Sequence, residues 1–164
     1  GPGVGGHCIA VDPWFIVSKT PEQARLIRTA REVNDAKPGW VINRVKLAVA
    51  EHLQANPNKT AREVTLACLG LAFKPDIDDL RESQALAITK TLAIQHPGRL
   101  LAVEPNVTAL PAALVDAGAV LMDAETALSD ADIVLALVAH RRFREFAPDT
   151  LQGKVLIDAC GLWR

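Results

Sequence analysis

The chain has 164 residues, of which 49% are hydrophobic and 23% charged, and its formal net charge is -1 at neutral pH. This is an ordinary globular composition, and the length suits one compact domain or one domain with an appended helical segment. Because Lys and Arg are scattered among Asp and Glu, we expect no nucleic-acid partner. No apolar stretch approaches the ~20 residues that span a bilayer, so we expect no membrane partner either.

The three cysteines, Cys8, Cys68 and Cys160, are too few and too scattered for a disulfide framework. A reducing cytoplasm is therefore the expected compartment. Cys68 falls inside an apolar run and is best explained as core filler. Cys8 follows a glycine-rich segment and has polar neighbours, so it is either a nucleophile or a small buried side chain. The chain starts at Gly1, without Met and inside that segment, which we interpret as a truncation point.

The first third of the chain reads as a loop followed by helices. Residues 1–19 are predicted to form a loop. A helix is expected from Thr20, which opens a T-x-x-Q capping box. Pro38 is expected to break or kink it, and a second helix then runs to Asn56. Both helices carry apolar side chains at helical spacing, and we expect a partner subunit or another domain to cover them.

The remainder alternates between strands and helices. The predicted strands cover residues 64–73, 100–103, 120–122, 133–138 and 155–157. The predicted helices cover residues 81–95, 110–117 and 125–130. The first strand is a continuous apolar run, as in a strand that is buried on both faces. The alternation predicts an α/β fold, a Rossmann-like parallel sheet with helices on both faces.

The first six residues, GPGVGG, match the dinucleotide-binding pattern G-x-G-x-x-G. We interpret the match as a decoy, because no strand precedes it and residues 7–13 are not expected to open a helix. The glycines are expected to let the backbone pass close to a ligand or adopt positive φ. His7 could act as a base for Cys8. However, neighbouring side chains on an extended loop point apart, so an ordinary loop residue is favoured.

A second motif, GLAFKPDIDDLRES, occupies residues 70–83 after the first strand. Ligands of open α/β sheets bind at this edge. Lys74 and Arg81 could hold phosphate, helped by a helix N-terminus near residue 81. The alternative is a solvated charge cluster in which the acids neutralise the bases. The three aspartates of the motif hint at calcium, but their spacing excludes an EF-hand.

Polar residues also follow two later strands. Glu104 ends the second strand, where a Rossmann fold often keeps an acid for ribose. The first loop lacks the glycine fingerprint, so we do not assign that role to Glu104. His140 and Arg141 end the fourth strand, and for them an ordinary strand-end loop is favoured.

Two strings carry a resemblance to a known family. Residues 5–13, GGHCIAVDP, resemble the G-G-x-C-x-x-x-D active-site loop of the UDP-glucose/GDP-mannose dehydrogenase family. Residues 70–83 resemble its second signature, G-L-A-F-K-x-x-x-D-D-x-R-E-S. The resemblance implies oxidation of the C6 alcohol of a UDP-sugar to a carboxylate, with NAD as cofactor. UDP-N-acetyl-D-mannosamine is the favoured substrate, and UDP-glucose and other UDP-N-acetylhexosamines stay open.

The resemblance also assigns roles to single residues. Cys8 matches the nucleophile that forms a thiohemiacetal and then a thioester. Asp12 matches the acid that helps to handle the water or its proton. Arg81 matches a position that reaches NAD. Contacts to the UDP-sugar are implied for Gly5, Phe73 and Lys74.

The family pattern divides the chain into three parts. It implies a catalytic cysteine loop over residues 1–19, a helical homodimerisation segment over residues 20–57 and a UDP-sugar-binding domain over residues 58–164. The NAD-binding domain would precede Gly1, so we expect the chain alone to be inactive. Cys160 stands where relatives usually place Arg or Lys, and a neutral thiol offers no charged contact. A non-catalytic nucleotide-sugar-binding or dimerisation module is the alternative function.

Overall fold

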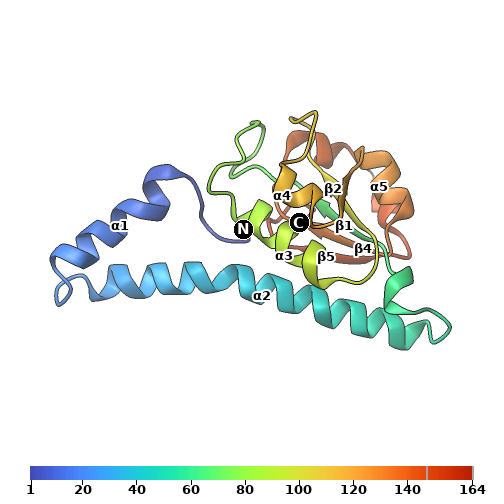
Figure 1. Cartoon of the computed structure of the whole chain (residues 1–164), viewed down its shortest axis with the longest axis horizontal. Helices are drawn as coiled ribbons and strands as arrows, with labels where there is room; N and C mark the ends of the chain where they lie inside the picture. The colour runs from blue at the N-terminus through green and yellow to red at the C-terminus, as the bar shows by residue number, and fades with distance from the viewer. Residues whose placement is uncertain (147, 164) are drawn as a thin grey trace.

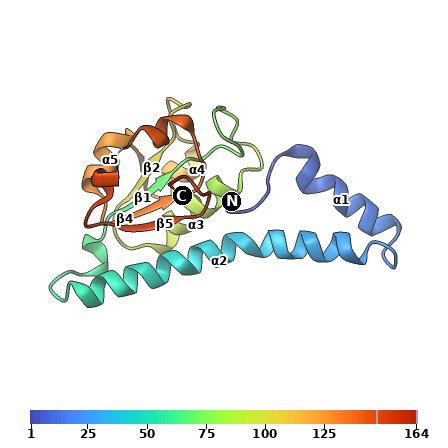
Figure 2. The same cartoon turned by 180° about the vertical axis from the view of Figure 1, so that it is seen from behind.

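A computed structural model describes residues 1–146 and 148–163 of the chain. The molecule consists of an α/β unit and a helical hairpin that projects from it (Figure 1). Helix α1 (His7–Lys19) packs against the first half of α2 (Arg25–Ala55) to form the hairpin. The second half of α2 runs along the α/β unit, as Figure 2 shows from behind. Among the described helices, none combines the length and apolarity needed to cross a bilayer.

Helix α1 corrects the prediction of a loop over residues 1–19. The helix begins at His7, directly after Gly6, which adopts φ 89°, and it continues through Pro13. No side chain caps its N-terminus. Val17 is buried, and α1 packs along α2. Tertiary packing therefore outweighs the weak local signals, as is usual for short helices.

Helix α2 corrects two further predictions. It begins at Arg25, and Thr20 instead follows the end of α1, where its hydroxyl donates to the Ile16 carbonyl at 3.0 Å. Pro38 lies inside the helix and does not break it. The helix is supported on both sides of Pro38, by α1 before it and by the sheet core after it, so it tolerates the lost hydrogen bond. The predicted end at Asn56 is confirmed.

The α/β unit contains one five-stranded sheet in the order β3-β2-β1-β4-β5, with every neighbouring pair parallel. The strands are β1 (Leu66–Leu69), β2 (Leu100–Val103), β3 (Ala119–Leu121), β4 (Ile133–Ala136) and β5 (Val155–Asp158). The α-helices are α3 (Gln84–Gln95), α4 (Ala112–Val115) and α5 (Ala124–Asp130). Short 3-10 helices are η1 (Ala61–Glu63), η2 (Arg141–Glu145) and η3 (Pro148–Leu151). The predicted Rossmann-like α/β fold is confirmed.

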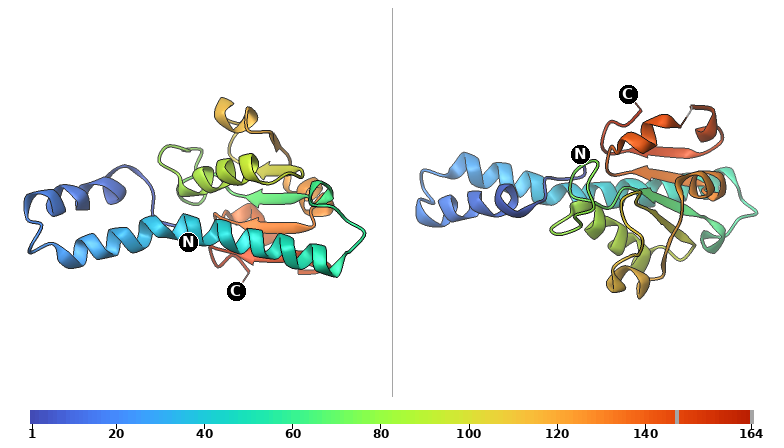
Figure 3. Two further views of the ribbon diagram at one scale, coloured as in Figure 1. Left: turned by 60° about the horizontal axis from the view of Figure 1, so that its bottom comes forward. Right: turned by 90° about the horizontal axis from the view of Figure 1, so that it is seen from above.

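Helices lie on both faces of the sheet (Figure 3), and each face carries a cluster of buried apolar side chains. Leu66 and Cys68 of β1 belong to the cluster that α2, α3 and α4 cover, whereas Ala67 and Leu69 belong to the cluster beneath α5. All four are fully buried, as predicted for a strand covered on both faces. The α2 side chains in the first cluster are Val41, Val45 and Ala48. The chain itself therefore covers half of the α2 stripe that was expected to need a partner.

The strand order changes direction between β1 and β4. Strands β2 and β3 lie on one side of β1, and β4 and β5 lie on the other. Gly70 ends β1 with φ 89°, and a Cβ there would lie 2.5 Å from Cβ of Val138. The first predicted strand thus stops at Leu69, because the chain must turn beside the end of β4. Such a switch point is where open α/β sheets bind ligands.

Candidate active site

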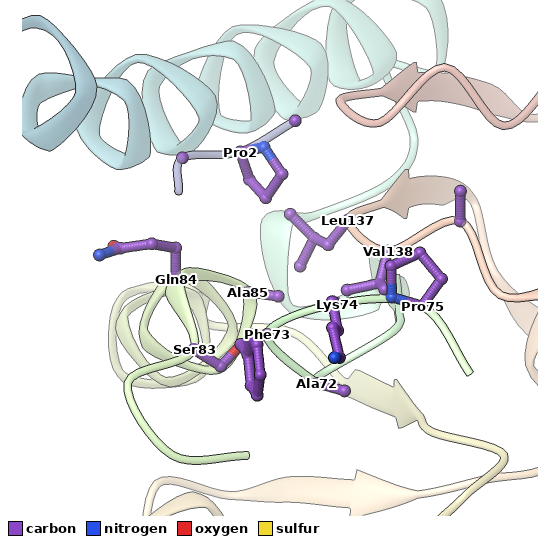
Figure 4. A pocket seen from close by; sticks show the side chains of 13 residues that line it. Pro2, Ala72, Phe73, Lys74, Pro75, Ser83, Gln84, Ala85, Leu137 and Val138 are labelled. Carbon is purple, nitrogen blue, oxygen red and sulfur yellow. The ribbon is translucent and has the colours of Figure 1, made fainter. Parts of the chain in front are cut away.

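A pocket of about 150 Å³ lies at this switch point. Four segments line it: the N-terminal residues, the loop after β1, the start of α3 and the residues after β4 (Figure 4). Figure 4 shows the Pro2 ring facing Leu137, with Ala85 of α3 nearby. Phe73 and Lys74 also line the pocket. The structure therefore brings two predicted UDP-sugar contacts to the edge of the sheet where a ligand is expected.

The N-terminal glycines lie against the loop after β1. The N–H of Gly6 donates to the Glu82 carbonyl at 3.3 Å. A Cβ at Gly5 would lie 2.2 Å from the Glu82 carbonyl oxygen, and one at Gly6 would lie 3.3 Å from the Phe73 ring. Gly5 is thus required by a close approach to protein backbone. Its predicted contact with the sugar stays a prediction.

The N-terminal segment is also fixed to α2. The Val4 N–H donates to Oδ1 of Asn34 at 2.7 Å, and Nδ2 of Asn34 donates to the Val4 carbonyl at 3.3 Å. One asparagine side chain therefore binds both backbone groups of Val4. The segment that leads to Cys8 is held between the hairpin and the loop after β1.

Cys8 and Asp12 lie near the start of α1, and both are exposed. They are four residues apart on a helix, so they lie on the same face, one turn apart. Neither residue lines the pocket beside Phe73. Cys8 is in the first helical turn, where backbone N–H groups lack helical partners and favour negative charge. The side chain of His7 lies outside the part that the structure describes.

The other two thiols are chemically different. Burial raises the pKa of the Cys68 thiol to about 12. Burial and the neighbouring Asp158 carboxylate raise the pKa of Cys160 to about 12. The Asp158 side chain accepts hydrogen bonds from four successive backbone N–H groups, starting with Cys160. Cys8 is therefore the one exposed cysteine of the three, and Cys160 belongs to a structural turn.

The loop after β1 is closed at its base by Ser83. Its hydroxyl donates to the Leu71 carbonyl at 2.6 Å and accepts the Leu86 N–H at 3.2 Å, which caps α3. Helix α3 accordingly begins at Gln84, three residues after the predicted N-terminus. Within the loop, the Phe73 N–H donates to the Asp79 carbonyl at 3.2 Å. The motif thus forms a compact turn that presents its first residues to the pocket.

Arg81 does not line the pocket. Its Nε donates to Oδ1 of Asp79 at 2.9 Å, and its Nη2 donates to Oδ2 at 2.7 Å. The Arg81 side chain is 73% exposed, so this pair is easily exchanged with another anion. In this structure Arg81 is paired with Asp79, as in the alternative of a charge cluster in which acids neutralise bases. The contact of Arg81 with NAD stays a prediction.

The residues after β2 and β4 form a buried polar network that the sequence analysis missed. Glu104 is 3% exposed and His140 is 1% exposed, and Nε2 of His140 lies 3.1 Å from Oε2 of Glu104. Burial raises the pKa of Glu104, but hydrogen bonds from His140 and the Leu71 N–H outweigh it, so the pKa is lowered overall. The expectation that His140 is an ordinary strand-end residue is wrong. The pairing could have been suspected from the sequence, because an acid and an imidazole each follow a wholly apolar strand.

Comparison with known proteins places these features in a family. Residues 67–164 match the UDP-binding domain of the UDP-glucose/GDP-mannose dehydrogenase family, and residues 1–36 match its central domain. The chain is 54% identical over its whole length to the UDP-N-acetyl-D-mannosamine dehydrogenase of Salmonella typhi. It is 56% identical over 163 residues to the NDP-N-acetyl-D-galactosaminuronic acid dehydrogenase of Ralstonia nicotianae. It spans 39% and 36% of the lengths of these two proteins.

Solved structures agree with this assignment. The UDP-N-acetyl-mannosamine dehydrogenase of Staphylococcus aureus matches 99% of this chain with 35% of its own, at 34% identity and a TM-score of 0.72. A GDP-mannose dehydrogenase of Pseudomonas aeruginosa matches 98% of this chain with 37% of its own, at 20% identity and the same TM-score, which supports the fold. Since the UDP-binding domain alone accounts for more than half of the sequence, the chain belongs to the UDP-glucose/GDP-mannose dehydrogenase family.

Proposed function

We propose that this chain is part of an NAD-dependent dehydrogenase that oxidises UDP-N-acetyl-D-mannosamine at C6 to UDP-N-acetyl-D-mannosaminuronate. The relatives at 54% identity support this substrate. The product would serve the synthesis of a surface polysaccharide such as enterobacterial common antigen. The chain spans about two fifths of those relatives. The activity is therefore proposed for the whole protein.

One observation carries the proposal: the segment leading to the exposed thiol is bonded to the loop that lines the pocket. The Gly6 N–H donates to the Glu82 carbonyl, and Gly6 also lies against the Phe73 ring. Cys8 follows two residues after Gly6, in the first turn of α1. A nucleotide sugar held by Phe73 and Lys74 could thus extend towards the start of α1. The proposed nucleophile and the proposed nucleotide site are linked by backbone contacts.

In the proposed reaction, C6 loses a hydride and the hydroxyl proton to become an aldehyde. The Cys8 sulfur then adds to the aldehyde carbon and forms a thiohemiacetal. Loss of a second hydride and a proton gives a thioester. Water attacks the thioester, the C–S bond breaks, and the carboxylate and the thiol are released. Asp12, one turn from Cys8, would accept the proton from the attacking water.

Two NAD molecules, bound one after the other, would each accept one of the two hydrides. The residues of this chain provide only part of a binding site for NAD. Helix α1 follows GPGVGG, contrary to the expectation that residues 7–13 open no helix, but the Gly6 N–H already donates to the Glu82 carbonyl. The motif therefore does not present this N–H to a pyrophosphate. Arg81 could contact the cofactor by exchanging Asp79 for a phosphate. We propose no further cofactor contact from this chain.

We also propose a homodimer through the helical hairpin. Large apolar side chains are exposed along α2 at intervals of seven residues, namely Leu26 (81%), Val33 (68%), Trp40 (52%) and Leu47 (54%). A repeat of seven keeps one stripe facing a partner helix, as in coiled coils. A second copy of the chain carries the same stripe and could therefore cover it by a two-fold arrangement.

The test is turnover of UDP-N-acetyl-D-mannosamine with NAD, followed by NADH absorbance. It uses this chain and a chain extended upstream to the length of its relatives. We expect activity in the extended protein, none in this chain, and complete loss on Cys8→Ser. Cys160→Ser is the matched control and should retain activity, since Cys160 is held in a structural turn.

An extended protein that binds the UDP-sugar without turning it over would support the alternative, a non-catalytic nucleotide-sugar-binding module. Activity that persists in Cys8→Ser would refute the covalent route. UDP-glucose, assayed in parallel, tests the sugar. A higher kcat/KM with UDP-glucose would contradict the proposed substrate.

A further inference from the structure

A buried carboxylate–imidazole pair joins the ends of three strands. Glu104 follows β2, and His140 lies beyond β4. Oε2 of Glu104 accepts the N–H groups of Leu71 at 2.7 Å and Ala72 at 3.1 Å, which begin the loop after β1. The same oxygen lies 3.1 Å from Nε2 of His140. Three parallel strands are therefore linked at the edge that carries the pocket.

The hydrogen-bond partners define the tautomer of His140. Nδ1 accepts the Asp76 N–H at 2.9 Å, so this nitrogen carries no proton. Nε2 then carries the proton and donates it to the Glu104 carboxylate. Both ring nitrogens are used in a site where His140 is 1% exposed. The imidazole therefore connects Glu104 directly to the middle of the loop.

Asp76 is one of two strained residues in that loop, the other being Glu82 at φ 51°. Asp76 adopts φ 61°, a left-handed conformation that is uncommon for residues other than glycine. Besides its bond to His140, Asp76 accepts two hydrogen bonds from Arg141, from the backbone N–H at 2.9 Å and from Nε at 3.1 Å. The strand-end residues His140 and Arg141 thus hold Asp76 in an unfavourable conformation.

The anchored positions flank the proposed nucleotide contacts. Ala72, bound to Glu104, immediately precedes Phe73 and Lys74, and Asp76 follows them after a single proline. The backbone is fixed on both sides of this pair, and both of its side chains line the pocket. Fixing a short segment at both ends defines where its side chains can point.

We propose that His140 is a positioning residue: with Glu104 it locks the loop at residues 70–83 so that Phe73 and Lys74 face the nucleotide. The inference rests on the proposed function, since it assumes that the pocket binds a UDP-sugar. His140 itself does not line the pocket and contacts no ligand in this account. It acts through the backbone of Asp76.

The experiment compares two replacements of His140 in the protein extended upstream to the length of its relatives. The amide of His140→Asn can replace Nδ1 and accept the Asp76 N–H, whereas that of His140→Gln can replace Nε2 and reach Glu104. Asp132→Asn is the stability control, because the Asp132 side chain is 17% exposed and accepts a backbone N–H at the opposite end of the sheet. Hydrogen exchange of the peptide over residues 72–81 and the affinity for UDP are measured in each variant.

We expect His140→Gln to exchange faster in this peptide and to bind UDP about tenfold more weakly or worse, since small misplacements cost up to ~100-fold. His140→Asn should recover part of both properties. The KM for the UDP-sugar should rise while the KM for NAD is unchanged. Asp132→Asn should lower the melting temperature without changing UDP affinity.

Two failures are distinguishable. If His140→Gln shows normal exchange in residues 72–81 and normal UDP affinity, the positioning role is wrong and the proposed function stands. If the unaltered protein does not bind UDP, the proposed function fails, and the inference falls with it even where exchange in the loop is accelerated. A uniform rise of exchange across β1 and β2 in His140→Gln would also overturn the inference, because it would indicate general destabilisation.

Discussion

The α/β unit buries its apolar side chains, whereas the helical hairpin exposes several large ones. All residues of β1, β2 and β4 are buried, and α2 covers one face of the sheet with Val41, Val45 and Ala48. The hairpin instead exposes large side chains such as Leu26, at 81%, and Phe15, at 66%. Large apolar side chains exposed in this way are those that the proposed dimer interface would cover.

The polar groups of the two regions differ less. At the pocket edge of the α/β unit, Glu104, Ser83 and His140 are buried and each has hydrogen-bond partners. In the hairpin, Nε of the buried Arg31 has no hydrogen-bond partner among the described residues, although its Nη2 pairs with Asp35. In the sheet unit, Nε1 of the partly buried Trp163 also lacks a partner among the described residues, so the two regions differ mainly in their exposed apolar side chains, which the proposed dimer would cover.

The largest expected effect tests the hairpin. Val33→Asp places a charge in the seven-residue stripe and should abolish dimer formation. Loss of two buried valines, one per protomer at about 2 kcal/mol each, weakens the dimer by roughly a thousandfold. Light scattering across a concentration series measures this. Val115→Asp is the matched control, because Val115 is exposed at 55% on α4 and lies outside the stripe. Equal dimerisation of both variants would contradict the proposed interface.

A smaller effect tests the sheet unit. Gly70→Ala should destabilise the protein by about 3 kcal/mol, because Ala must adopt a positive φ and its Cβ would overlap Val138. Gly153→Ala is the control, since Gly153 has φ 76° but an added Cβ would meet nothing within 4 Å. It should cost only about 1 kcal/mol. Denaturant unfolding measures both, and equal losses would show that the contact with Val138 relaxes.

The smallest effect tests the end of the sheet unit that lies farthest along α2 from the hairpin. Asp132 accepts hydrogen bonds from Lys59 and the Thr65 N–H, and Asp132→Asn should cost about 1 kcal/mol at neutral pH. Burial raises the pKa of Asp132, but the contacts with Lys59 and Thr65 lower it by more. The pKa of Asp132 is therefore below its ordinary value of 3.8. A carboxylate with a lowered pKa stabilises the fold above the ordinary value, and this stabilisation disappears as the pH falls through the folded value.

The difference in melting temperature between the unaltered chain and Asp132→Asn should therefore be constant from neutral pH down to about pH 5. It should close below pH 4, where the carboxylate becomes protonated. A difference that is absent at neutral pH, or that persists unchanged below about pH 4, would mean that the ion pair does not stabilise the fold.

The sequence predicted the sheet well because each strand carries its own signal. Residues 100–103 are continuously apolar, and the observed strand has the predicted bounds. The hairpin was predicted poorly because its signals are tertiary. Pro13 and Pro38 argue locally against helix, and only the packing of α1 on α2 and of α2 on the sheet overrides them.

Some residues of the candidate site could likewise be placed from the sequence, and others could not. Lys74 could be placed near the pocket because it follows a predicted strand, and strand ends meet at one edge of a parallel sheet, whereas the contact of Phe73 was implied only by the family resemblance. The pairing of Glu104 with His140 joins residues 36 positions apart. It depends on β2 and β4 flanking β1, and the strand order was not predicted from the sequence.

Because α2 is continuous through Pro38, it fixes both the distance and the rotation between the residues at its two ends. Asn34 holds the segment before Cys8, and seven residues later Val41 is packed in the sheet core. Together with the contact between Gly6 and Glu82, the helix therefore determines how far, and in which direction, the thiol is displaced from the nucleotide pocket. One residue inserted between these two positions would turn the hairpin by about 100° and shift it by about 1.5 Å, whereas seven would restore the direction at a displacement of about 10 Å. The spacing between Asn34 and Val41 is thus a part of the candidate active site, although neither residue touches the substrate in the proposed mechanism.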